Sequence, residues 1–334
     1  MARGKLTLRV LAGLTAFALA GLTACGTGGG APGASGGGGE KKAIGVSVAD
    51  QKSLFYVAAV QGMQAQAEKR GYKLVVTSAN NNSSQQVSQV NDLLTQQVGA
   101  LIFTSQDSTA AAAGVKAANK AQVPVIAVDQ RPESGQGELA TYIATDSVKA
   151  ARELCTWMFQ QMGGSGEIAI LHGVLGSTAE IQRTQGCQEA IKATPGVKVV
   201  AEETANWDET EAFKATQNIL AAHPQLKAVF GESDAMGLGA AKAAQQANRH
   251  DGMQFVGIDG FPTMFDGVKA GLTQATMAQQ PYHMGEIAVD NAIQVMEGGA
   301  ALPAEQYQDT VLINKETVDQ NDVTKFYGPT AKSS

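Results

Sequence analysis

Two aspartates, Asp129 and Asp259, end two similar segments of the chain, VPVIAVD and MQFVGID. Each follows a short run dense in Val and Ile, which is typical of a buried strand. Parallel sheets bind their ligands at the carboxyl ends of their strands, and carboxylates there accept hydrogen bonds from hydroxyl groups. An Asp after a strand can also simply cap the following turn or helix. Because the two occupy matched positions of a repeat, we expect them to face one cleft.

The chain lacks the residue patterns of common catalytic and metal sites. It has no phosphate-binding P-loop and no HExxH zinc motif, and around Ser233 the second glycine of a GxSxG nucleophile elbow is replaced by Ala235. The four histidines are dispersed along the chain, so we expect each of them to be solvated or to cap a turn or helix. They are His172, His223, His250 and His283. We therefore expect no enzyme, no cofactor and no metal site.

The elements that position the two aspartates form a pattern that runs twice. In the first run, strands are predicted at 43–48, 72–78, 99–105 and 123–129, with helices at 53–70, 84–97 and 109–121. In the second, strands are predicted at 167–173, 197–203, 226–234 and 253–260, with helices at 177–193, 209–222 and 234–247. Alternating buried strands and helices indicate parallel sheets covered on both faces. The fold class is therefore α/β, with two similar doubly wound lobes.

The first 42 residues have a different composition. Three basic residues precede an apolar run from Val10 to Leu22, which is typical of an export signal. The following LTAC resembles the lipobox of bacterial lipoproteins, which predicts a signal peptide at 1–24 and a lipidated Cys25. An ordinary signal peptide with a chance cysteine is the alternative. Residues 25–42 are rich in Gly, Ala and Ser, and we expect them to form a flexible tether.

Charge and hydropathy exclude several classes of protein. Without residues 1–24 the chain has 22 Lys and Arg against 31 Asp and Glu, and this acidic balance argues against nucleic acid as a partner. No later apolar run approaches the ~20 residues of a transmembrane helix. We expect an extracytoplasmic protein that is held at the membrane by its lipid alone.

Two further cysteines, Cys155 and Cys187, remain beyond Cys25. In an exported protein an even pair suggests a disulfide. The alternative is two buried thiols that act as small apolar residues.

The organisation of residues 42–315 resembles the type I periplasmic binding proteins, in the branch that contains ribose-binding protein. The resemblance rests on segments in the expected order, among them LFYVAAVQGMQAQAEKRGYKLVV, VPVIAVDQR, ATDSVKAA, STAEIQRTQGC, AHPQLKAVFGESDAMGLGA, VGIDGFP and ATMAQQP. It implies two lobes joined by a hinge of three crossing strands, near 145–146, 279–280 and 310–311. One lobe would contain 43–145 and 281–310, the other 146–279 and 311–325, and 326–334 would form a tail.

The resemblance also implies a pocket between the lobes. Its residues would be Ser53, Phe55, Tyr56, Asp129, Arg183, Trp207, Ser233, Asp259 and Gln279. Aromatic rings would cover the C–H faces of a sugar, while carboxylates and the guanidinium bind its hydroxyls. These residues also have simpler interpretations. Phe55 and Tyr56 could pack in the core, Arg183 could lie on the surface, Trp207 could form a hydrophobic staple and Gln279 could belong to a linker.

Three positions depart from the ribose pattern. Ser53 and Ser233 stand where Asn is usual, and Gln130 follows Asp129 where Arg is usual. These shorter or altered side chains favour a larger or wetter site, so a hexose, another pentose or a polyol is as well suited as ribose.

The resemblance implies a substrate-binding lipoprotein of an ABC importer, a monomer whose partners are a permease and its ATPase. A receptor that presents its ligand to a sensor kinase or chemoreceptor is the alternative. Repressors use the same two lobes behind a DNA-binding helix-turn-helix, but the export signal and the acidic chain exclude that class.

Overall fold

The computed structural model describes residues 43–331 except 111 and 134, and these belong to one compact unit. The predicted signal peptide, Cys25 and the tether lie outside the described residues. Among the described helices, none combines the length and the apolar character needed to cross a membrane.

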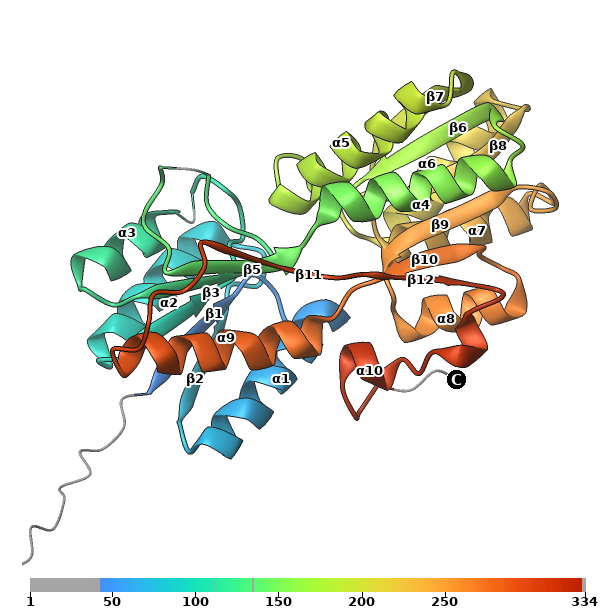
Figure 1. Cartoon of the computed structure of the whole chain (residues 1–334). Helices are drawn as coiled ribbons and strands as arrows, with labels where there is room; N and C mark the ends of the chain where they lie inside the picture. Colours follow the sequence, from blue (N-terminus) through green and yellow to red (C-terminus); the bar gives the residue numbers. More distant parts are fainter. Residues whose placement is uncertain (1–42, 111, 134, 332–334) are drawn as a thin grey trace, which may run out of the picture. The chain divides into compact units, whose positions relative to one another are not determined.

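The first lobe is built on sheet A, a six-stranded sheet within the described residues (Figure 1). Its strands are β1 (Ile44–Val48), β2 (Leu74–Ser78), β3 (Ala100–Phe103), β4 (Val125–Val128), β5 (Thr141–Thr145) and β11 (Glu305–Gln308). They lie in the order β11-β5-β4-β3-β1-β2, and all their pairings are parallel.

Sheet B, on which the second lobe is built, repeats this order. Its strands are β6 (Ser165–His172), β7 (Gly196–Thr204), β8 (Leu226–Gly231), β9 (Gln254–Asp259), β10 (Ala275–Ala278) and β12 (Val311–Asn314). They lie in the order β12-β10-β9-β8-β6-β7. Only β12 is antiparallel to its neighbour among the described pairings.

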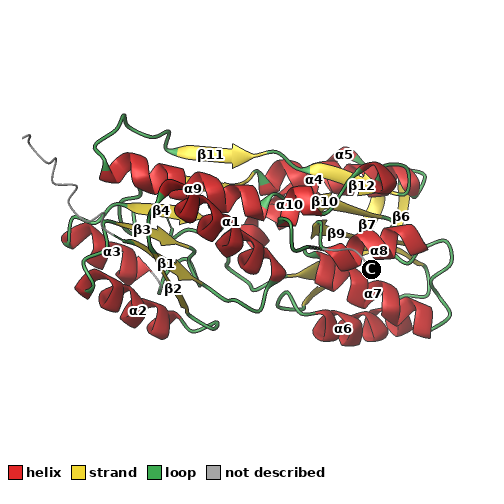
Figure 2. Cartoon of the chain, turned by 90° about the horizontal axis from the view of Figure 1, so that it is seen from below, coloured by secondary structure: helices red, strands yellow, loops and turns green. Residues whose placement is uncertain are grey.

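Helices cover both faces of each sheet (Figure 2). In the first lobe α1 (Leu54–Arg70) packs on α9 (Pro281–Met296), and α2 (Ser83–Thr95) packs on α3 (Ala112–Lys120). In the second, α4 (Ser147–Gln161) packs on α5 (Thr178–Ala193), and α6 (Glu209–Ala222) packs on α7 (Asp234–Gln246). The α8 helix (Pro262–Ala270), the 3₁₀ turn at Val318–Gln320 and α10 (Thr324–Tyr327) complete the described helices.

Alternation along the strands explains why both faces are covered. Ala100 and Ile102 of β3 pack into the core formed with α1 and α9, whereas Leu101 and Phe103 pack into the core formed with α2 and α3. Successive side chains of a strand point to opposite faces, so a strand that is apolar throughout needs a layer on each side. The predicted fold class, two doubly wound α/β lobes, is confirmed.

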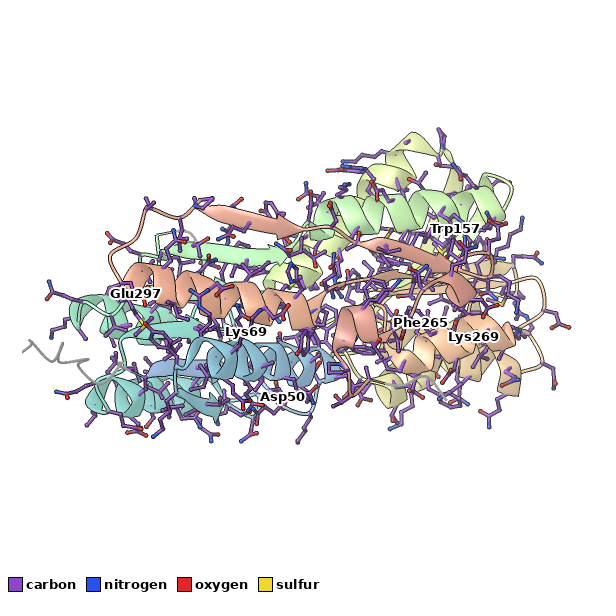
Figure 3. The ribbon with its side chains drawn as sticks, turned by 60° about the horizontal axis from the view of Figure 1, so that its bottom comes forward. Asp50, Lys69, Trp157, Phe265, Lys269 and Glu297 are labelled. Carbon is purple, nitrogen blue, oxygen red and sulfur yellow. A yellow bond between two sulfur atoms is a disulfide. The ribbon has the colours of Figure 1, made fainter. Side chains whose placement is uncertain are left out.

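Figure 3 labels Trp157 on α4 and Phe265 on α8, which pack in different clusters of the second lobe. Trp157 on α4 is partly buried against the cluster between sheet B and α5. Phe265 on α8 belongs to a separate buried cluster that also contains residues of α10.

The chain passes between the sheets three times. The links join β5 to α4, β10 to α9 and β11 to β12, where only Asp309 and Thr310 separate the last two strands. Because these links are short, only a few backbone dihedral angles can change when one lobe moves relative to the other.

The C-terminal residues differ from the tail expected at 326–334. Phe326 and Tyr327 are buried against Phe265, Ile313 and Ala58 of α1. The Tyr327 hydroxyl donates a hydrogen bond of 2.9 Å to the backbone carbonyl of Asp259. Residues 326–327 therefore support the end of β9.

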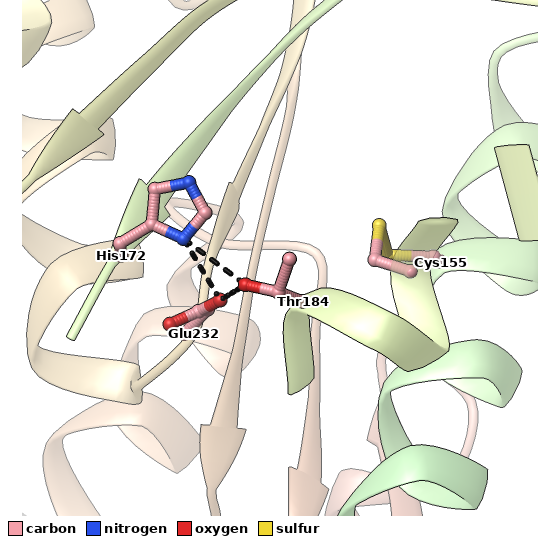
Figure 4. Close-up of a disulfide and its surroundings, with 5 residues drawn as sticks. Cys155, His172, Thr184 and Glu232 are labelled. Atoms are coloured by element: carbon pink, nitrogen blue, oxygen red, sulfur yellow. Dashed lines mark hydrogen bonds and ion pairs between the residues drawn. A yellow bond between two sulfur atoms is a disulfide. The ribbon is translucent and has the colours of Figure 1, made fainter. Parts of the chain in front are cut away.

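A disulfide joins Cys155 of α4 to Cys187 of α5 (Figure 4), with Cα atoms 5.4 Å apart. Both residues are fully buried in the core beneath these helices. The pair closes a loop with a sequence separation of 32.

Replacing both cysteines by Ala, in a Cys25→Ser chain, should lower the free energy of unfolding by about 3.5 kcal/mol, because the loop no longer constrains the unfolded chain. Denaturant titration measures this loss. Thiol titration of the unreduced, unfolded Cys25→Ser protein should find no free thiol, and two thiols per chain would contradict the bridge.

Candidate functional site

All nine residues predicted to form a pocket line one cavity of about 920 Å³, to which both lobes contribute. Most of them follow the carboxyl ends of strands in sheets A and B, where parallel sheets form their ligand sites.

The wall from the first lobe begins at the start of α1. Ser53 is the N-cap residue of this helix, but its side chain makes no capping hydrogen bond. Phe55 and Tyr56 follow in the first turn, with ring centroids 5.4 Å apart in an edge-to-face arrangement. Both rings also belong to the core beneath α1 and α9. Core packing thus fixes two rings that also line the cavity.

Tyr56 and Asp129 are joined by a hydrogen bond. The Tyr56 hydroxyl donates to Oδ2 of Asp129 at 2.8 Å, and the Gln130 amide donates to the same hydroxyl at 3.1 Å. Asp129 has a φ of 63° directly after β4, a left-handed conformation that is uncommon for residues other than glycine. This turn places the carboxylate on the cavity wall instead of continuing the strand.

In the second lobe, Arg183 of α5 faces Asp259 at the end of β9. Its Nη1 lies 3.4 Å from Oδ1 of Asp259 and donates to the backbone carbonyl of Glu232. The guanidinium is almost fully buried, and its Nε has no hydrogen-bond partner within the described residues. Arg183 also lines the cavity, so its guanidinium faces the space that a solute would occupy.

Gln279 connects Asp259 to the first lobe. Its Nε2 donates to Oδ1 of Asp259 at 2.9 Å, and its Oε1 accepts from Thr145, the last residue of β5, at 2.7 Å. Gln279 follows β10 at a crossing between the lobes. One amide therefore links the two sheets at the base of the cavity.

Ser233 and Asp234 fix the start of α7. The Ser233 hydroxyl accepts the capping hydrogen bond from Met236 and keeps its own proton for a further bond. The buried Asp234 carboxylate accepts from the backbone N–H groups of Gly260 and Phe261, each at 2.7 Å. Asp234 thus holds the turn that follows Asp259.

Trp207 lies in a turn before α6, where it and Asn206 have positive φ angles of 64° and 49°. Its indole packs so closely on Gly173 that a Cβ there would lie 2.0 Å from the ring. Arg183 lies over the same ring, with Cζ 5.5 Å from the centroid, a distance typical of a cation–π contact.

Burial dominates the electrostatics of the site. It raises the pKa of Asp129 above its usual range, although the Tyr56 hydrogen bond and the charge of Arg183 oppose this shift. Burial also raises the pKa of Asp259, against the nearby charge of Arg183. Burial and then the neighbouring Asp259 raise the pKa of Asp234. The cavity therefore holds carboxylates that gain from new hydrogen-bond donors.

The cavity is also lined by residues that the sequence analysis did not assign, among them Asp50, Asn81, Gln106, Asn206 and Phe261. All of them follow predicted strands within a few residues. Their positions after predicted strands could have marked them as candidates for the site. The sequence does not show, however, which way their side chains point.

The chain matches the family model described as periplasmic binding protein domain over residues 44–300. It is 34% identical to the ribose import binding protein of Bacillus subtilis (strain 168) over 262 residues, which cover 78% of this chain and 84% of that protein. It is 36% identical to the xylitol-binding protein of Mycolicibacterium smegmatis over 233 residues, which cover 70% of this chain and 66% of that protein. The structure is similar to that of an ABC transporter periplasmic solute binding protein from Actinobacillus succinogenes with bound D-allose, with a TM-score of 0.80, 27% identity and coverage of 84% of this chain and 100% of the other. With this sequence match and these two sheets, the chain belongs to the periplasmic binding protein family, in its type I, ribose-binding-like branch, whose members bind solutes and are not enzymes.

Proposed function

We propose that this protein binds a monosaccharide or a small polyol between its two lobes and delivers it to an ABC importer. The observation that carries this proposal is the joint placement of Asp129, Asp259 and Arg183 on one cavity that is also lined by aromatic side chains.

These groups suit a polyhydroxyl solute. Hydroxyls donate to the carboxylates and accept from the guanidinium of Arg183, and hydrogen bonds to charged groups contribute about 1.5–3 kcal/mol each. Phe55, Tyr56 and Trp207 offer apolar surfaces to the C–H groups of the same molecule. The relatives named above for ribose, xylitol and allose support this class of solute.

The solute need not be ribose itself. Ser53 does not cap its helix, and Ser233 caps its helix through its oxygen, so each offers one short hydroxyl to the cavity. Gln130 binds the Tyr56 hydroxyl. We therefore propose a pentose, a hexose or a polyol as the solute class.

Binding would operate by closure about the three crossings between the sheets. A solute that contacts Asp129 in one lobe and Arg183 in the other favours the arrangement in which both contacts form. The bond from Thr145 to Gln279 lies at one of these crossings. The importer then distinguishes loaded from empty protein by the surfaces of the lobes.

The location and partners follow from the same proposal. The protein acts outside the cytoplasm as a monomer, anchored through a lipidated Cys25, and its partners are a permease and the associated ATPase.

A screen of pentoses, hexoses and polyols should find a solute that raises the melting temperature, because a ligand that binds only the folded state stabilises it. The same solute should change the tryptophan fluorescence, since Trp207 lines the cavity.

Trp207→Ala should weaken binding by about 2 kcal/mol, roughly thirtyfold. Gly173→Ala should also weaken binding, because the added Cβ displaces the indole.

Trp157 provides the matched control, because it packs on the core of the second lobe and does not line the cavity. The fluorescence change should survive in Trp157→Phe and vanish in Trp207→Phe. A screen without any stabilising sugar or polyol would reject the proposed solute class, and unchanged affinity in Trp207→Ala would remove Trp207 from the site.

Solute affinity should fall as the pH is lowered from 7 towards 5. Burial raises the pKa values of Asp129 and Asp259 in the free protein, and hydroxyl donors favour the ionised carboxylates, so they lower these pKa values again. Binding then releases protons, and a lower pH opposes it. Calorimetry at several pH values measures this trend, with circular dichroism to verify folding. An affinity that stays constant or rises towards pH 5 would contradict it.

Cys25→Ser should release the protein from the membrane and leave solute affinity unchanged, because the residues that line the cavity all lie beyond residue 48. Fractionation of cells and calorimetry on the released protein measure the two properties. Membrane retention of the variant would reject the lipid anchor.

A further inference from the structure

A histidine and two glutamates meet in the second lobe behind the cavity wall. His172 ends β6, Glu232 directly follows β8, and Glu180 lies in the first turn of α5. Because β6 and β8 are paired parallel strands, His172 and Glu232 leave the sheet side by side (Figure 4). None of the three lines the cavity, and all three are buried.

The potential ligand atoms are spaced as around one ion. Nδ1 of His172 lies 3.2 Å from Oε1 of Glu232 and 3.6 Å from Oε1 of Glu180. Zinc binds histidine nitrogen and carboxylate oxygen at about 2.0–2.2 Å, which places neighbouring ligands of a tetrahedron about 3.4 Å apart. The Thr184 hydroxyl also lies in the cluster, 3.1 Å from Nδ1 of His172, and donates a hydrogen bond of 2.6 Å to Oε1 of Glu232.

Backbone groups hold the carboxylates in this orientation. The second oxygen of Glu232 accepts from the N–H of Gly173 at 2.9 Å, and the second oxygen of Glu180 accepts from the N–H of Gly176 at 3.0 Å. The first oxygen of each is thereby turned towards His172. On the other side of the ring, Nε2 of His172 lies 3.7 Å from Glu202, as the second nitrogen of a metal-binding histidine commonly faces a carboxylate.

The two carboxylates of the cluster share one ion-pair partner within the described residues. Glu232 is fully buried and the side chain of Glu180 is 10% exposed. Across the described residues, His172 is the only cationic partner of either carboxylate in an ion pair. The cluster thus brings two acidic side chains and one imidazole together in a buried place, where unpaired negative charge is costly. A divalent cation would supply the missing positive charge.

We propose that His172, Glu180 and Glu232 bind one divalent transition-metal ion of the zinc class. Imidazole nitrogen with two carboxylates suits Zn²⁺ and Co²⁺, whereas Mg²⁺ and Ca²⁺ prefer oxygen ligands alone. The ion would tie the end of β6, the end of β8 and the start of α5 together. Arg183 and Ser233, which line the cavity, are the neighbours in sequence of Thr184 and Glu232. The ion would therefore stabilise the wall that carries Arg183.

The test adds Zn²⁺ alone to the full chain after removal of metals with a chelator. Calorimetry should find one equivalent bound per chain, and the melting temperature should rise with Zn²⁺. Co²⁺ in place of Zn²⁺ should give the visible absorption of a tetrahedral site. His172→Gln should weaken Zn²⁺ binding by at least about 100-fold, because mutating even a residue that only hydrogen-bonds to a metal ligand lowers metal affinity by 10–100-fold.

His283 offers a matched control. It forms a similar pair with Glu286, with 3.1 Å between Nδ1 and Oε2, but on an exposed surface. His283→Gln should leave Zn²⁺ binding unchanged, whereas Glu180→Gln should weaken it, and circular dichroism verifies that each variant is folded. The proposal is overturned if the parent binds no Zn²⁺, or if His172→Gln binds it as tightly as the parent does. The cluster would then be a network of ion pairs around a protonated histidine. Because no solute is used, failure of this test leaves the proposed transport function untouched.

Discussion

The buried carboxylate of Asp259 is the group around which the site is organised. It needs donors because it lies between the sheets with little access to water, and it receives them from Arg183, from Gln279 and from the backbone N–H of Asp234. Each donor comes from a different element. The need of this one carboxylate for hydrogen bonds therefore sets the positions of α5, α7 and the crossing after β10 relative to one another. Gln279 extends this dependence to the first lobe through Thr145. The position of one charged group thus determines how the wall of the second lobe meets the hinge.

A second layer of contacts keeps that carboxylate in place. Asp234 binds the turn after β9 through two backbone N–H groups, and Thr276 donates to its other oxygen at 2.6 Å. Tyr327 binds the carbonyl of Asp259 from the opposite side. These contacts join protein groups alone, so they can hold the wall of the cavity without help from a solute. The free energy of solute contacts is then available to favour closure instead of ordering side chains.

The parts of the structure that follow from local pattern could be predicted, whereas those that depend on packing between distant segments could not. The segments VPVIAVD and MQFVGID predict both a strand and the position of its final Asp, because burial and strand direction are encoded locally. The hydrogen bond from Tyr56 to Asp129 joins residues 73 positions apart, and no local pattern specifies it. The burial of Phe326 and Tyr327 depends on α8 and β12, and a four-residue helix has no period to reveal its buried face. His172 was expected to be solvated or capping, yet its side chain is only 11% exposed. Its place at a strand end, matched by Glu232 on the neighbouring strand, was the signal for the cluster.

The charge of the cavity bears on the proposed class of solute. Five acidic residues line it, Asp50, Asp129, Asp208, Glu209 and Asp259, against the basic residues Lys52 and Arg183. Asp208 caps α6 and Asp129 already accepts a bond from Tyr56, but neither bond removes a negative charge. An anionic solute, such as a sugar acid or a sugar phosphate, would add charge of the same sign at low dielectric, where repulsion is strong. A neutral polyol instead brings many hydroxyl donors, and each can satisfy a carboxylate oxygen that lacks one. The guanidinium of Arg183 has the complementary need, and in the proposed function a hydroxyl or ring oxygen of the same neutral solute would accept from it. A neutral solute that donates and accepts at once therefore fits the proposed function best.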